Sequence, residues 1–161
     1  MRILGVDPGL KTTGYGLIDV MTPKIKLIEA GCIEPKPKDL FQNRIDSVYR
    51  NLNAILQRYE PDVMVLEKLY AHYKHPTTAC LLGHIRGVIC LLSAQSHIQL
   101  KEYAVKRIRK ALTGNGNAPK FQTCRMVAHF LNIDERQLNL DASDALALAL
   151  GHVHMAVPIA L

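Results

Sequence analysis

At 161 residues, the chain is long enough to bury a substantial hydrophobic core, and we expect one domain spanning residues 1–161. Its balance of 48% hydrophobic and 21% charged residues is ordinary for a globular protein, and no repeat or low-complexity tract is present. The net charge of +6 and the pI near 9.2 are consistent with a nucleic acid or another polyanion as partner.

The cysteines and the apolar runs indicate the cellular compartment of the protein. The four cysteines have no C-x-x-C spacing, which argues against a zinc site and a disulfide framework: Cys32, Cys80, Cys90 and Cys124. We therefore expect reduced thiols and a cytoplasmic location. The chain opens on a predicted strand with no basic-then-apolar leader, so we expect no secretory signal. We expect no membrane span either, because the richest apolar run, residues 145–161, is interrupted by His152, His154 and Pro158.

The first part of the chain predicts three strands and a helix. The predicted strands cover residues 2–7, 11–20 and 25–33. The first is an apolar run that ends on Asp7, immediately before the turn signal Pro8-Gly9, and it pairs with the second as a hairpin. Apolar residues at three- and four-residue steps predict a helix over residues 40–59, with Asp39 as its N-cap.

Strands and helices then alternate. Residues 63–66 predict a short buried strand that is followed directly by Glu67. A helix from Thr77 or Thr78 to Gln95 is apolar on most sides, so it needs cover on more than one face. The remaining elements are a strand at residues 97–100 and helices at 104–112, 119–131 and 141–156. This order predicts an α/β fold with a mixed central sheet of about five strands flanked by helices.

Four carboxylates stand where a ligand site is expected. Asp7 and Glu67 each end a buried strand, the position at which open α/β sheets place their ligands. Asp141 and Asp144 lie three apart, so they share one face of a helix. Each also has an ordinary explanation, as a turn residue, a helix N-cap or a first-turn acid. The combination favours a shared metal site, because converging carboxylates repel one another unless a cation lies among them.

The ligand types indicate which metal. Hard oxygen donors without a His–Cys cluster favour magnesium, with manganese as a substitute, over zinc. Two such ions per subunit, about 4 Å apart, would activate a water and stabilise the leaving oxygen of a phosphodiester. The carboxylates therefore predict a metal-dependent nuclease.

Several short motifs resemble the RuvC family of bacterial Holliday junction resolvases. They are Gly5-Val6-Asp7-Pro8-Gly9, Thr13-Gly14-Tyr15-Gly16, Leu66-Glu67, Gly83 with Arg86-Gly87-Val88, Gly114-x-Gly116 followed by Lys120, and Asp141 to Ala147. These motifs follow the family's order over nearly the whole chain. The resemblance implies an RNase H-like fold and a homodimer that resolves four-way junctions by paired, symmetric, magnesium-dependent nicks. It also implies a role in homologous recombination and DNA repair, with the branch-migration proteins RuvA and RuvB as partners.

The resemblance also assigns site residues. The family's catalytic metal ligands fall on Asp7, Glu67, Asp141 and Asp144, the carboxylates selected above. The aromatic residue that stacks on an unpaired base falls on Tyr70, where many members have Phe. Two basic residues for catalysis or DNA contact fall on Arg109 and Lys120. The first is often lysine in the family, and arginine is not an equivalent donor.

Basic residues gather between Lys101 and Arg125, where Glu102 is the only acid. The predicted DNA contacts are Tyr70, Lys106, Arg107, Arg109, Lys110 and Lys120. Lys120 starts a helix that follows a glycine-rich loop, and the N-terminus of a helix is a common binding site for phosphate. The ordinary explanation of such charge is a solvated helix face. Together with the net charge, the pattern favours phosphate binding that weakens with salt. Residues 70–75 mix aromatics with basic groups, as expected of either a stacking platform or an exposed loop.

A four-way junction has near two-fold symmetry, and its resolution needs two cuts, so a two-fold dimer is expected. The apolar helix from Thr78 to Gln95 is the candidate interface, and a charge at Leu82 or Ile89 should break the dimer.

Three alternative functions compete with a junction resolvase. A non-catalytic junction-binding module leaves the four carboxylates unexplained. An actin-like phosphotransferase shares the Asp-x-Gly turn but needs two domains, which 161 residues cannot supply. Another nuclease of the same fold, acting on RNA or a different branched DNA, stays open from the residues alone.

Overall fold

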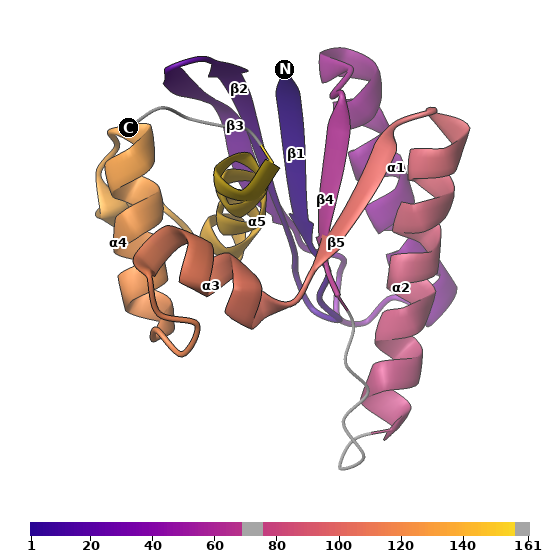
Figure 1. Ribbon diagram of the computed structural model, residues 1–161. Helices are drawn as coiled ribbons and strands as arrows, with labels where there is room; N and C mark the ends of the chain where they lie inside the picture. The colour runs from indigo at the N-terminus through magenta and orange to yellow at the C-terminus, as the bar shows by residue number, and fades with distance from the viewer. Residues whose placement is uncertain (69–75, 157–161) are drawn as a thin grey trace.

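A central five-stranded sheet carries helices on both faces in the computed structural model, which describes residues 1–68 and 76–156 (Figure 1). The strands are β1 (Arg2–Asp7), β2 (Thr13–Met21), β3 (Lys24–Ile33), β4 (Val63–Glu67) and β5 (Gln99–Tyr103). The helices are α1 (Phe41–Tyr59), α2 (Pro76–Gln95), α3 (Val105–Thr113), α4 (Lys120–Leu131) and α5 (Leu140–Ala156), with a short 3-10 helix η1 (Glu135–Gln137).

The sheet is mixed, as predicted, with the strand order β3-β2-β1-β4-β5. β1 pairs antiparallel with β2, and β2 with β3, so the first two strands form the predicted hairpin. β4 lies parallel to β1 on one side and to β5 on the other. Parallel neighbours need a crossover connection, and α2 provides the one between β4 and β5. The carboxyl ends of β1, β4 and β5 therefore meet at one edge of the sheet.

The side chains of the central strands alternate between two separate cores. Ile3 and Val65 pack on the face covered by α3, α4 and α5, whereas Leu4, Val6 and Leu66 pack on the face covered by α1 and α2. Figure 1 shows these helices on opposite sides of the sheet. Both faces are covered, which explains why the central strands are continuous apolar runs in the sequence.

A few predicted boundaries are wrong. Asp39 is not the N-cap of α1; Leu40 takes that position and no side chain caps the helix. β5 begins at Gln99, later than predicted, because the chain first closes the end of α2. There His97 has a φ of 54°, and the N–H of Ile98 donates to the carbonyl of Ser93 at 3.0 Å. The 3-10 helix η1 was not predicted, since three residues carry no periodic signal.

Helix α2 has little of its apolar surface buried. It is long and apolar enough to cross a membrane by length and composition, with 22% of its most apolar stretch buried, and it is the one such helix in the described ranges. The expectation that no apolar run reaches that length is therefore wrong. Ile89 packs fully buried in the protein's own core, so it is also a wrong choice for an interface residue. Leu91 is 51% exposed and lies on the uncovered side.

Candidate active site

Strand alternation directs Asp7 and Glu67 to the same face of the sheet. Glu67 follows Val65 by two residues in β4, and Asp7 follows Ile3 by four residues in β1, so both carboxylates share the face that packs against α5. β1 and β4 are parallel and in register. The two acids therefore leave the sheet side by side at its carboxyl edge, where α/β folds bind ligands.

Glycines let helix α5 come close enough to complete the site. A Cβ on Gly5 would stand 1.9 Å from the carbonyl oxygen of Ala145, and a Cβ on Gly14 would stand 2.1 Å from that of Asp141. Any larger residue at these strand positions would push the helix off the sheet. The close approach places the first turn of α5, with Asp141 and Asp144, beside the ends of β1 and β2.

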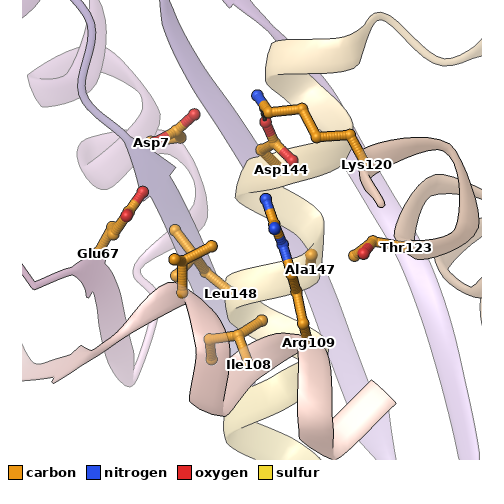
Figure 2. A pocket seen from close by; sticks show the side chains of 10 residues that line it. Asp7, Glu67, Ile108, Arg109, Lys120, Thr123, Asp144, Ala147 and Leu148 are labelled. Carbon is orange, nitrogen blue, oxygen red and sulfur yellow. Dashed lines mark hydrogen bonds and ion pairs between the residues drawn. The ribbon is translucent and has the colours of Figure 1, made fainter. Parts of the chain in front are cut away.

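A pocket of about 170 Å³ opens at this point between the strand ends and helices α3, α4 and α5 (Figure 2). Three of the four predicted carboxylates line it: Asp7, Glu67 and Asp144. Figure 2 shows Lys120 from α4 and Arg109 from α3 reaching toward these acids. Asp141 does not line the pocket and lies one turn before Asp144 on α5. The rest of the lining is mostly apolar: Val105, Ile108, Thr123, Ala147 and Leu148.

The carboxylates crowd one another in a partly desolvated site. Burial raises the pKa of Asp7 to about 7, with further contributions from the charges of Asp144 and Glu67. Burial also raises the pKa of Glu67, with Asp144 adding to the effect and Lys120 and Arg109 opposing it. The Nζ of Lys120 donates to Oδ2 of Asp144 at 2.6 Å, and this hydrogen bond raises the pKa of Lys120. The crowded acids would be stabilised by an added cation.

This donor set suits a hard divalent cation in its chemistry, because it consists of carboxylate oxygens under mutual repulsion. Within residues 1–68 and 76–156, however, no three Asp, Glu, His or Cys side chains are close enough together to hold one metal ion. Lys120 contributes to this, since its ammonium already holds one oxygen of Asp144. Sharing an ion requires the carboxylates to turn toward one another, and the Asp144 oxygen that Lys120 does not hold remains available as a ligand.

The predicted basic surface lies beside the pocket on α3. Lys106, Arg107 and Lys110 are exposed, whereas Arg109 is half-buried and lines the pocket. The structure therefore separates Arg109, which faces the acids, from its three neighbours, which face solvent. Tyr70 lies outside the described residues, as does the rest of the predicted stacking loop.

Thr123 is a pocket residue that was not predicted. It lies one turn after Lys120 on α4, it is buried, and its Oγ1 has no hydrogen-bond partner among the described residues. A buried hydroxyl without a partner costs about 1–3 kcal/mol unless water or a ligand pairs with it. A threonine inside a helix has no distinctive sequence signal, and only the packing of α4 beside α5 brings it to the pocket.

Known proteins are similar to this chain in sequence and in fold. The family model for "Crossover junction endodeoxyribonuclease RuvC" matches residues 3–152. RuvC of Rhodopirellula baltica is 41% identical over 151 residues, which cover 93% of this chain and 85% of that protein. Thermus thermophilus RuvC superposes with a TM-score of 0.88 at 24% identity, covering 97% of this chain and 95% of that one. Its structure in complex with Holliday junction substrate has a TM-score of 0.87 at 22% identity, with the same coverage of 97% and 95%. The family match over nearly all of the chain and the 41% identity show that the chain belongs to the RuvC family.

Proposed function

We propose that the protein is a Holliday junction resolvase, an endonuclease that hydrolyses phosphodiesters in four-way junction DNA by paired symmetric nicks. The observation that carries this proposal is the pocket at the carboxyl edge of the sheet. There Asp7, Glu67 and Asp144 face Lys120 and Arg109. Membership of the RuvC family, whose members are named crossover junction endodeoxyribonucleases, supports junction DNA as the substrate.

In this proposal Asp7, Glu67 and Asp144 hold magnesium, or manganese in its place, and Asp141 joins them from the preceding turn of α5. Two bound ions would supply an activated water and stabilise the charge on the leaving oxygen. The raised pKa of Asp7, at about 7, means that burial and the neighbouring acids disfavour its charge, which a nearby cation would stabilise. The Lys120 ammonium has three N–H donors and gives one to Asp144, so in this proposal it also binds a phosphate.

The chain's own cations bind and orient the DNA strand. Lys120 and Arg109 lie on the pocket side opposite the strand-end acids, so a scissile phosphate between the two groups meets positive charge on one side (Figure 2). The exposed residues Lys106, Arg107 and Lys110 extend this charge along α3 and contact flanking phosphates. Tyr70 stacks on an unpaired base at the junction in the same proposal.

Two pockets in a two-fold dimer account for two symmetric cuts. Helix α2 supports this assembly, because its uncovered side presents Leu91 at 51% exposure next to Gly87, where an added Cβ would meet nothing within 4 Å. RuvA and RuvB are the expected partners that deliver the junction.

The experiment incubates the protein with a labelled four-way junction, with the same sequence as duplex DNA, and with an RNA–DNA hybrid. Each is tested with magnesium, with manganese and with EDTA. We expect symmetric nicks in the junction alone and only with metal, and no nicks from Asp7→Asn, which keeps the shape of the side chain without its charge. Junction binding without metal-dependent nicks would instead indicate a binding module, and cleavage of the hybrid would indicate a ribonuclease.

A further inference from the structure

Helix α2 carries a single Lys, Arg, Asp or Glu, and the side chain of that residue is largely covered. The rest of its sequence from Pro76 to Gln95 has no Lys, Arg, Asp or Glu. Arg86 stands in the middle of this helix with only 11% of its side chain exposed. Taking a guanidinium out of water is costly, and an apolar side chain at such a position is often as stable or more so. The position of this arginine therefore calls for an explanation from its contacts.

The Arg86 guanidinium bridges the ends of two strands. One terminal nitrogen donates to the backbone carbonyl oxygen of Glu67, the last residue of β4, and the other donates to the carboxylate of Glu102 in β5. These residues are neighbours in the sheet, since Glu67 pairs with Tyr103 in the parallel register. The next link between the strands is the N–H of Lys68, which donates to the carbonyl of Tyr103 at 2.8 Å.

Arg86 and the Glu67 side chain lie on opposite faces of the sheet. The Glu67 side chain points into the pocket on the face of α5, whereas Arg86 approaches its backbone from α2 on the other face. A fork of two donors from one rigid plane holds both partners at once, which the single ammonium of a lysine does not. The same contacts also account for Glu102, the only acid within the basic stretch from Lys101 to Arg125.

We infer that Arg86 is a positioning residue, which fixes the end of β4 so that the Glu67 carboxylate is aimed at the metal-binding pocket. This inference rests on the proposed function, and it adds a residue outside the pocket, on the helix proposed to form the dimer interface. Residues that orient metal ligands in this way typically contribute about 10- to 100-fold to metal affinity or activity. Loss of Arg86 should therefore act on metal use and leave DNA binding intact.

The experiment compares four variants with the wild-type protein. Arg86→Ala removes both contacts, Arg86→Lys keeps the charge without the fork, and Glu102→Gln keeps the contact to the Glu67 carbonyl. Arg50→Ala is the matched control, because Arg50 forms an exposed ion pair with Asp46 on α1, far in the fold from the pocket. Three quantities are measured: the magnesium concentration for half-maximal junction cleavage, the thermal shift with manganese alone, and junction affinity in EDTA.

For Arg86→Ala we expect the half-maximal magnesium concentration and the manganese midpoint of the thermal shift to rise about 10- to 100-fold, with junction affinity unchanged. Arg86→Lys should fall between Arg86→Ala and wild type, and Glu102→Gln and Arg50→Ala should stay near wild type. If Arg86→Ala does not fold, Arg86→Lys carries the same test with a smaller expected rise.

Wild-type metal midpoints in Arg86→Ala, or in Arg86→Lys where that variant replaces it, would overturn the inference while leaving the proposed function standing. So would a loss of thermal stability in EDTA that is not accompanied by a change in the metal midpoints, since this is the result of a purely structural role. A wild-type protein that neither cleaves the junction nor responds to manganese would overturn the proposed function, and the inference with it.

Discussion

Replacing the Asp7 carboxylate by an amide should stabilise the metal-free protein at neutral pH. The pKa of Asp7 is raised from the ordinary 3.8 to about 7, first by burial and then by Asp144 and Glu67. The folded state therefore holds a proton on Asp7 over a pH range in which the unfolded chain has lost it. Asp7→Asn removes this ionisation, so it should relieve the repulsion that the wild-type protein keeps in its pocket.

The magnitude follows from the two pKa values. The stabilising contribution of neutral Asp7 is fully present below about pH 3.8 and is lost as the pH rises to about 7. At 1.36 kcal/mol per pKa unit, the ionised carboxylate lowers the free energy of unfolding by up to about 4 kcal/mol above pH 7. The asparagine of Asp7→Asn does not ionise, so this variant keeps its free energy of unfolding as the pH rises. We expect the difference between the two proteins to widen by about 1.4 kcal/mol per pH unit from pH 4 to pH 7 and then to level off.

The assay is urea unfolding in EDTA at pH 5, 6, 7 and 8, followed by circular dichroism. The control is Asp19→Asn, because the Arg2 guanidinium lowers the pKa of Asp19 and its removal should have the opposite sign. Added magnesium should raise the stability of the wild-type protein at pH 8 and have little effect on Asp7→Asn. A difference between wild type and Asp7→Asn that does not change from pH 5 to pH 8 would refute the electrostatic account of the pocket.

Three further results are expected. Lys120→Ala should lower junction cleavage about 100-fold or more in single-turnover assays while weakening binding only modestly, because in the proposed site the ammonium beside Asp144 stabilises the charge of the reacting phosphate; equal losses in both would contradict this. Gly5→Ala should cost about 3 kcal/mol or more in urea unfolding, since its Cβ meets the Ala145 carbonyl oxygen at 1.9 Å. Its control, Gly83→Ala, adds a Cβ that meets nothing within 4 Å in the same subunit, so it should cost much less than Gly5→Ala. Leu91→Glu should yield a folded monomer by light scattering, because this side chain is 51% exposed; a dimer of unchanged affinity would place the interface elsewhere.

The sequence by itself determined the elements and the chemical character of the site. Apolar runs and three- to four-residue periodicity specified the five strands and five helices to within a few residues, because burial on one or both faces imposes those patterns directly. The strand-end position of Asp7 and Glu67 also followed from local pattern. The prediction of a hard cation also needs only the donor atoms.

Only the tertiary structure decided which of these residues meet. It brought Asp7, Glu67 and Asp144 to one pocket and left Asp141 outside its lining. It also paired Lys120 with Asp144, a contact that the predicted role of Lys120 in catalysis or DNA binding did not include. The contacts of Arg86 with two strand ends and the burial of Ile89 likewise have no local signal. The physical reason is that a side chain's partners depend on how closely helices and sheet approach. Here the absence of a Cβ atom at Gly5 and Gly14 lets α5 approach the sheet closely. These glycines lie more than a hundred residues before α5 in the sequence, so no local pattern reveals the contact.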